Sequence, residues 1–260
     1  MAADHYLIYK VIVIGGEIMI KTIVAVVLLA ATMVGAMSGG SNLRAAEKHE
    51  LEESVAAQNE QEVTLGSRVT FGHYPADSEG KIWEPVQWQV LEINQGKVLL
   101  YAVQVIEAKA YHETRATHSW QEADLRRWLN SEFLAAAFNE QEQAVLRENT
   151  LPTGNEDGQT LPADKVFLLS RTELDHYLPQ AADRVNKPTP WAKNGGVYVN
   201  EKGEAAFWLR SVVREGQVQD YISSYGTPGN RVHYADELVI GIRPAIWVDR
   251  MALRTHNVLQ

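Results

Sequence analysis

Two arginines stand at the ends of strongly apolar runs, where a guanidinium group is unusual. Arg210 follows the run 207–209, and Arg243 precedes the run 244–248. A guanidinium presents several donors in a planar fork, so it can clamp a carboxylate or phosphate of a ligand. The same fork can instead pair with a buried acid or with carbonyl groups at strand ends. Because the flanking sequence is so apolar, we expect Arg210 and Arg243 to be buried and structural.

The stretch 220–236 is rich in side chains that recognise ligands. Exposed aromatic rings stack on flat ligand faces, and neighbouring amides and acids add hydrogen bonds, a combination that suits sugars and peptides. An ordinary hairpin whose tyrosines alternate into the core explains the same pattern. Trp191 lies in a loop rich in Pro and Gly and is a further candidate, since binding residues tend to lie on loops. The candidate ligand-binding residues are therefore Trp191, Tyr221, Tyr225, Asn230, Tyr234 and Asp236.

No motif in the sequence identifies an active site or a metal site. The chain has no cysteine, which excludes disulfides, thiolate metal sites, iron–sulfur clusters and cysteine nucleophiles. His112 and His118 have a spacing that matches no familiar zinc motif. Ser, His and Asp are plentiful, but no nucleophile elbow distinguishes any of them. We therefore expect no catalytic residue, no metal ion and no cofactor.

The acidic composition limits the partners. The chain has 33 Asp and Glu against 24 Lys and Arg, a net charge of −9, and within residues 1–36 the charges cancel. Nucleic acids and anionic membrane surfaces require basic patches that replace counterions. The sequence therefore predicts no nucleic-acid partner, and contact with a membrane only through the amino-terminal segment.

An uncharged apolar run over residues 22–36 follows Lys21 and ends in small residues. A basic start, an apolar centre and a small-residue exit are typical of a signal peptide. An uncleaved membrane anchor, which needs about 20 apolar residues, is the alternative. Residues 1–18 add a second apolar run, which suggests an over-extended start, and residues 37–63 form an acidic spacer. We therefore expect a secreted or cell-envelope protein in which residues 1–36 are a signal peptide or an anchor.

Residues 64–250 are expected to form a single globular domain, followed by a tail over residues 251–260. Alternating apolar residues predict opening strands over 68–74, 86–90 and 97–106. Capping boxes, in which Ser or Asn is followed three residues later by Glu, then predict three short helices, with starts at Ser119, Asn139 and Ser170. Strands return from residue 207 onward, with Trp128 of the first helix and Trp208 of the later strands in structural positions. This order of strands, helices and strands predicts the α+β class.

Four parts of the domain carry distinctive motifs in a fixed order. They are LGSRVTFGHYP (65–75), WQEADLRRWLNSEF (120–133) with its LRxWLN motif, VFLLSRTE (166–173), and FWLRS (207–211) with GIRPAIWV (241–248), which hold WLRS and RPA. This combination resembles an uncharacterised family of bacterial exported domains. The resemblance covers about residues 65–249 and implies no activity, because the function of the family is unknown.

The layout also resembles, more distantly, the C-type-lectin-like fold. That fold has antiparallel sheets, here with two to three short helices, and a loop-rich half that presents ligands. The formylglycine-generating enzymes share it, but their oxidase chemistry depends on cysteines and is not carried over. Together with the α+β order, the resemblance implies that the first and last strands pair and so protect the sheet edges. Val69 or Phe71 would then lie near Ile246 or Val248.

The leading hypothesis is an extracytoplasmic recognition module that binds an extracellular or envelope ligand, a glycan or a peptide or protein, through the loops after Leu178. A hydrolase that acts on envelope material and a structural envelope protein that holds a partner stay open as alternatives. A pocket lined by acids or His with shifted pKa values would favour the enzyme. A shallow aromatic surface would favour recognition, and a broad apolar patch would favour a protein partner.

Overall fold

A computed structural model of the chain describes residues 63–114, 119–152, 160–213, 218–229, 235–237 and 239–256. The expected signal peptide or anchor, nearly all of the acidic spacer, and the candidate residues Asn230 and Tyr234 lie outside these ranges. Within the ranges, no helix combines the length and the apolar composition needed to cross a bilayer.

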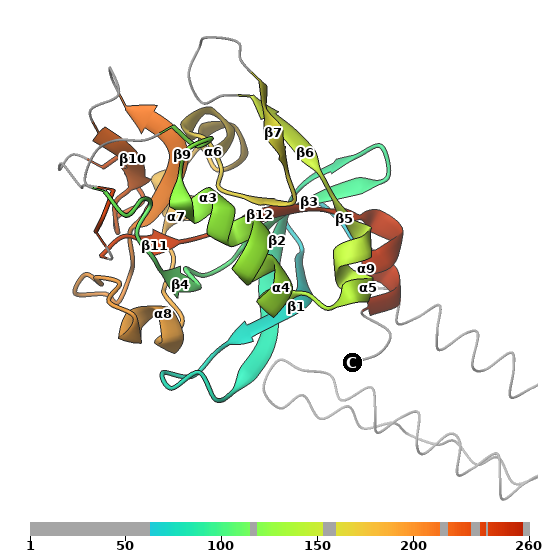
Figure 1. The fold of residues 1–260 in the computed structure, drawn as a ribbon, viewed down its shortest axis with the longest axis horizontal. Helices are drawn as coiled ribbons and strands as arrows, with labels where there is room; N and C mark the ends of the chain where they lie inside the picture. Colours follow the sequence, from blue (N-terminus) through green and yellow to red (C-terminus); the bar gives the residue numbers. More distant parts are fainter. Residues whose placement is uncertain are drawn as a thin grey trace, which may run out of the picture. The chain divides into compact units, whose positions relative to one another are not determined.

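The larger sheet begins as a meander at the start of the domain (Figure 1). β1 (Arg68–Pro75), β2 (Trp83–Asn94) and β3 (Lys97–Ala102) pair in succession, antiparallel. Gln95 and Gly96 alone connect β2 to β3, and both have positive φ angles, 48° and 79°. Such a two-residue turn matches the twist of the strands, and glycine adopts its backbone angles without strain.

β12 (Ala245–Asp249) extends the same sheet beside β3. The other edge of β12 is covered by two short strands placed end to end, β8 (Val166–Phe167) and β5 (Leu146–Arg147). The expected pairing of the first and last strands is therefore wrong. The strand order β1-β2-β3-β12 places β2 and β3 between them.

The meander leaves one free edge on β1 and one on β3, and β12 pairs with β3, so β1 stays at the edge of the sheet. Part of that edge is satisfied by a side chain. The amide of Gly72 donates to Glu142 at 3.2 Å, and Glu142 is buried. The Glu142 carboxylate thus accepts a hydrogen bond from β1, whose edge the last strand was expected to cover.

The second sheet has the order β10-β9-β11-β4. β9 (Phe207–Val213) and β10 (Val218–Ile222) are antiparallel, whereas the short β11 (Gly241–Ile242) runs parallel to β9 and pairs with β4 (Glu107–Ala108) on its other side. The sequence predicts one closing strand over residues 242–248, but the chain changes sheet there. β11 belongs to the second sheet and β12 to the first.

A separate antiparallel hairpin is formed by β6 (Asn149–Pro152) and β7 (Thr160–Asp164). In Figure 1 it projects from the same side of the domain as β5. The sequence predicts a loop for most of this region because of its Pro and Gly content.

The first helical run comprises α3 (Asp124–Trp128), a π-helical turn η2 (Leu129–Phe133) and α4 (Leu134–Ala137). Leu125, Leu129 and Phe133 are buried, as their helical spacing predicts. Ser119 does not cap this run, because the helix begins only at Asp124. The Ser119 hydroxyl instead bonds the Glu122 side chain at 3.1 Å within a preceding turn.

The other two capping boxes are formed as the sequence predicts. Asn139 and Glu142 cap α5 (Glu140–Val145), and Ser170 and Glu173 cap α6 (Arg171–Tyr177). Both boxes are local in sequence and each opens a helix, whereas the same pattern at Ser119 and Glu122 forms only a turn before α3.

Three further short helices were not expected, α7 (Ala181–Arg184), α8 (Pro190–Asn194) and α9 (Arg250–His256). α8 starts at Thr189, whose hydroxyl accepts from the amide of Ala192, and Pro190 occupies its first turn, where proline is favoured. In α9, Leu253 is buried, so the region expected to be a tail begins as a packed helix.

Aromatic side chains fill the interior. Trp88 is fully buried, and its indole donates to the carbonyl of Phe71 at 2.7 Å. Tyr111 and Tyr221 pack edge-on against Trp208, with ring centroids 6.1 and 6.2 Å away. The domain is of the α+β class, with a curled antiparallel sheet and short helices, as the sequence predicts.

Candidate functional site

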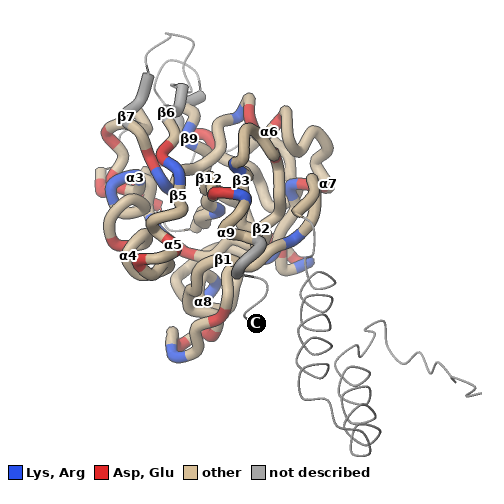
Figure 2. Tube along the Cα trace, turned by 90° about the vertical axis from the view of Figure 1, so that its right-hand side faces the viewer, with Lys and Arg blue, Asp and Glu red and all other residues tan. Residues whose placement is uncertain are grey.

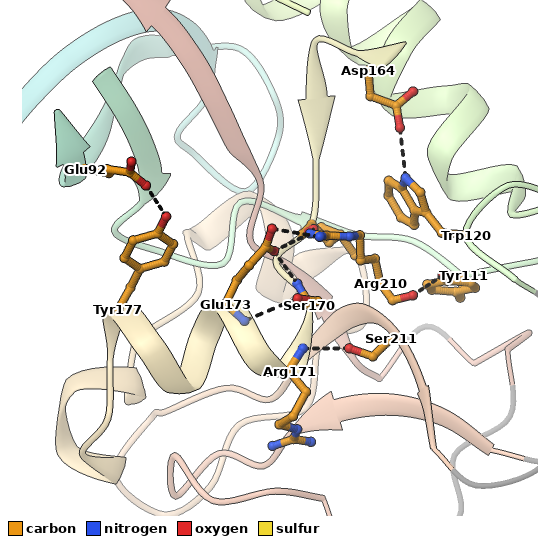
Figure 3. A network of polar contacts seen from close by, with 11 residues as sticks. Glu92, Tyr111, Trp120, Asp164, Ser170, Arg171, Glu173, Tyr177, Arg210 and Ser211 are labelled. Atoms are coloured by element: carbon orange, nitrogen blue, oxygen red, sulfur yellow. Dashed lines mark hydrogen bonds and ion pairs between the residues drawn. The ribbon is translucent and has the colours of Figure 1, made fainter. Parts of the chain in front are cut away.

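Arg210 lies in β9 with only 1% of its surface exposed. Its Nη1 donates to the carbonyl of Leu168 at 2.8 Å, and its two Nη atoms grip the carboxylate of Glu173, with Nη2 to Oε1 at 2.7 Å (Figure 3). Glu173 also accepts from the amide of Ser170 at 2.8 Å, so one carboxylate both closes the cap of α6 and pairs with the buried arginine. The WLRS and SRTE segments therefore meet in the interior.

The same network continues to Arg171 and Asp220. The amide of Arg171 donates to the hydroxyl of Ser211 at 2.6 Å, and its guanidinium bonds both carboxylate oxygens of Asp220. Burial raises the pKa of Asp220 above its usual value, although the bonds to Arg171 oppose this. A buried acid with a raised pKa can mark an active site. Here both oxygens are held by Arg171, so Asp220 is placed as a fixed ion-pair partner.

Arg243 is also buried, but no carboxylate holds it within the described residues. Its Nε donates to the carbonyl of Ala102 at 2.7 Å, and its Nη1 to the carbonyl of Arg184 at 3.1 Å. The guanidinium carbon lies 4.2 Å from the ring centroid of Tyr101, a cation–π contact. Burial lowers the pKa of Arg243. Arg210 therefore pairs with a carboxylate, whereas Arg243 bonds one carbonyl at the end of β3 and one at the end of α7.

The stretch 220–236 divides into buried and exposed residues. Tyr221 is buried against Trp208, so the expectation that it contacts a ligand does not fit its position; it alternates into the core. Tyr225 and Asp236 are exposed. Trp128, which was expected to be structural, lies in α3 and is half-buried against Phe133. The Nζ of Lys109 lies 5.0 Å from its ring centroid.

Trp191 lies where aromatic and polar groups converge. Its indole N–H donates to Oε2 of Glu107 at 2.9 Å, and the hydroxyl of Tyr74 donates to the same oxygen at 2.6 Å. The other oxygen of Glu107 accepts from the amide of Ala108 at 2.8 Å. Burial raises the pKa of Tyr74, and the nearby carboxylate adds to the rise, so the phenol remains a donor. With three donors bound, Glu107 fixes the two rings in place.

A shallow groove runs beside Tyr74. Its lining combines one tyrosine with aliphatic and proline side chains, two neutral amides, a threonine and one acid: Tyr74, Pro75, Ala76, Glu84, Pro85, Val86, Gln87, Gln104, Ile106 and Thr189. These lining residues include no Lys or Arg. The groove is therefore equipped to bind a ligand by flat apolar contact and neutral hydrogen bonds.

The tip of the β1–β2 hairpin extends the aromatic surface next to the groove. Trp83 is 47% exposed, and its ring packs edge-on against Tyr74 with centroids 5.9 Å apart. A Cβ on Gly80 would lie 2.8 Å from the ring of Trp191, so the absent side chain allows the hairpin to approach α8. The amide of Asn194 ties the two together by donating to the carbonyl of Ser78 at 2.9 Å.

Charged residues of both signs are distributed over the domain. Figure 2 shows Lys and Arg interleaved with Asp and Glu along the described trace. Within the described part of the chain, no group of three His, Cys, Asp or Glu side chains converges to hold a metal ion.

The sequence singled out Trp191 as a candidate but not Tyr74, Glu107, Gln87 and Gln104, which the structure places near it or around the groove. The signal for Gln87 was present, because the inward alternation of Val86 and Trp88 leaves it facing outward. Glu107 gives no such signal, since its partners lie 33 and 84 residues away in the chain. Only the fold brings them together.

Residues 95–250 match a domain of unknown function, DUF6273, so the chain belongs to this domain family. The match begins at the β2–β3 turn and ends at the start of α9, whereas the resemblance seen in the sequence also included β1. No curated protein and no solved structure matches the chain. The groove therefore lies partly outside the family region, since Tyr74 and Gln87 precede residue 95.

Proposed function

We propose that this domain is an extracytoplasmic recognition module that binds neutral glycans in the groove beside Tyr74. The observation that carries the proposal is the exposed ring of Trp83, backed by the largely buried ring of Tyr74, next to the groove that the amides of Gln87 and Gln104 line. Sugar rings present apolar C–H faces to aromatic rings and hydroxyls to amides, so both parts of the ligand find a partner.

The charge of the groove selects against acidic glycans. Glu84 is the acid in its lining, and Glu107 lies just behind Tyr74. A uronate or a phosphate in this position would meet carboxylates with no Lys or Arg among the lining residues to offset them. A neutral sugar, or one that carries an amino group, avoids this repulsion.

The small number of carboxylates without a hydrogen-bond donor near the groove favours recognition over hydrolysis. Glycoside hydrolases generally use two carboxyl groups on opposite sides of the bond to be cleaved. Here Glu107 already accepts three hydrogen bonds, which leaves Glu84 as the free carboxylate of the lining. One free acid suits hydrogen bonding to a sugar better than acid–base chemistry.

The extracytoplasmic location rests on the uncharged apolar run 22–36 that follows Lys21. The C-type-lectin-like arrangement rests on the α+β order with its loop-rich half. Peptide mapping of the protein from its native host tests the location. We expect the mature chain either to begin after residue 36 or to fractionate with the membrane. A cytoplasmic product with an intact amino terminus would contradict this part of the proposal.

A glycan array probed with the full chain tests the ligand class. We expect neutral or amino-sugar glycans to bind and acidic glycans to fail. The double variant Gln87→Ala, Gln104→Ala should lose at least about tenfold in affinity, because each amide contributes roughly 1 kcal/mol of hydrogen bonding. Gln141→Ala, an exposed glutamine on α5, is the matched control. Binding to a peptide array and to no glycan would contradict the glycan proposal and support a protein ligand. Release of cleaved sugar would support the hydrolase alternative.

A further inference from the structure

A second exposed aromatic surface lies on the loops that follow α8. We call it the tyrosine surface, and it consists of Tyr198, Tyr225 and Val239, which are 63%, 53% and 37% exposed. Tyr198 and Val239 are neighbours, since the amide of Tyr198 donates to the carbonyl of Val239 at 3.1 Å.

The loop that carries Tyr225 is rigidly built. The amide of Ser223 donates to the carbonyl of Thr227 at 2.8 Å, and the two hydroxyls are also 2.8 Å apart. Gly226 has a φ of 76°, and a Cβ there would lie 1.9 Å from the carbonyl oxygen of Ala181, so only glycine allows this approach to α7. An exposed ring on such a loop is held outward at little entropic cost on binding.

Hydrogen bonds join this loop to the one that carries Tyr198. The amide nitrogen of Asn200 donates to Glu204 at 2.9 Å and to the carbonyl of Ser224 at 3.4 Å. The hydroxyl of Tyr225 donates to the carboxylate of Glu201 at 3.1 Å. Two exposed rings and an exposed carboxylate are therefore presented by one connected unit.

We propose that the tyrosine surface docks a basic segment of a partner protein, in which an arginine guanidinium stacks on the ring of Tyr225 and pairs with Glu201. A guanidinium stacks on aromatic faces and forms bidentate bonds to carboxylates, which matches both parts of the surface. The carboxylates of Glu201 and Glu204 outweigh the single Lys202 between them, so the local charge suits a cation. The protein as a whole, at −9, adds a long-range attraction for basic partners.

Titration of the full chain with a short peptide that contains two arginines tests this proposal. A matched peptide with citrulline in their place keeps the shape and removes the charge. We expect the citrulline peptide to bind at least about tenfold more weakly, and a lysine peptide to fall between the two. Binding should also weaken at high salt.

Variants locate the binding to this surface. Tyr225→Ala and Glu201→Gln should each weaken the arginine peptide about fivefold, whereas Glu113→Gln, at an exposed acid elsewhere, should have no effect. Tyr225→Phe keeps the ring and should bind nearly as well as the parent. Equal binding of the arginine and citrulline peptides, or unchanged binding by Tyr225→Ala, would overturn the proposal. Trp191→Ala, next to the groove, should leave peptide binding intact, so this result does not depend on the glycan proposal.

Discussion

Two carboxylates of this domain make the same number of contacts in very different surroundings. Glu173 accepts from the amide of Ser170 and both Nη atoms of Arg210, whereas Glu107 accepts from Ala108, Tyr74 and Trp191. The arginine held by Glu173 is wholly inside the protein. One of the rings held by Glu107 is partly exposed, and the other borders a groove. Each carboxylate accepts three hydrogen bonds and so holds its partners in place. Glu173 holds a buried arginine that supports the fold, whereas Glu107 holds two rings beside the proposed glycan site.

The largest effect should come from removing the buried arginine of this pair. Arg210→Ala leaves Glu173 without its counter-charge, so we expect a loss of about 3–5 kcal/mol in the free energy of unfolding. Urea denaturation followed by tryptophan fluorescence measures it. Arg147→Ala breaks the exposed ion pair with Asp249 and should cost under about 1 kcal/mol.

Arg243→Ala should be less costly than Arg210→Ala, since it leaves two carbonyls without a donor but no buried acid. If Arg210→Ala unfolds at the same urea concentration as the parent while ligand binding disappears, the arginine belongs to a binding site and the comparison fails.

An intermediate effect is expected at the other carboxylate. Glu107→Gln replaces a charged acceptor with an amide whose N–H₂ faces the amide of Ala108, so we expect a loss of about 1–3 kcal/mol in stability. Tyr74 and Trp191 then share a neutral oxygen in place of a carboxylate, so both rings are held more weakly and glycan affinity should fall as well. Unchanged affinity in a folded Glu107→Gln protein would show that the rings need no charged anchor.

The smallest effect concerns the exposed pair on β12 and β5. The hydrogen bond from Arg147 holds the pKa of Asp249 below its usual value. The folded state therefore favours the ionised form, and the stabilisation is present above the unfolded pKa of about 4 and lost as pH falls through the folded pKa. Asp249→Asn should cost under about 1 kcal/mol at pH 7 and nothing near pH 2, measured by urea denaturation at each pH. An equal cost at both pH values would rule out the ion pair as the cause.

Features that depend on adjacent residues could be predicted from the sequence. The Gln95-Gly96 turn and the capping boxes at Asn139 and Ser170 are specified by a few neighbouring side chains. Burial of Arg210 follows from the apolar residues around it. These predictions hold because local steric and hydrogen-bonding preferences decide the structure at these positions, whereas the same pattern at Ser119 and Glu122 forms only a turn before α3.

Features that depend on distant residues could not be predicted. β12 pairs with β3, although the alternating pattern of β1 would allow β12 to pair there instead. The choice between the two depends on long-range packing. Tyr221 and Tyr225 look alike in sequence, but only the packing of Trp208 against Tyr221 separates the buried ring from the exposed one. The cluster around Glu107 likewise exists only in three dimensions.

Side-chain nuclear magnetic resonance of the full chain tests most directly whether the ligand binds in the groove or at the arginine network. Tryptophan indole and glutamine amide N–H signals would be followed while a neutral glycan selected on the array is added. We predict that the signals of Gln87, Gln104, Trp83 and Trp191 shift, while those of the buried Trp88 and Trp208 stay in place. Shifts at Trp208 with none at Gln87 or Gln104 would contradict the account and move the binding site to the arginine network.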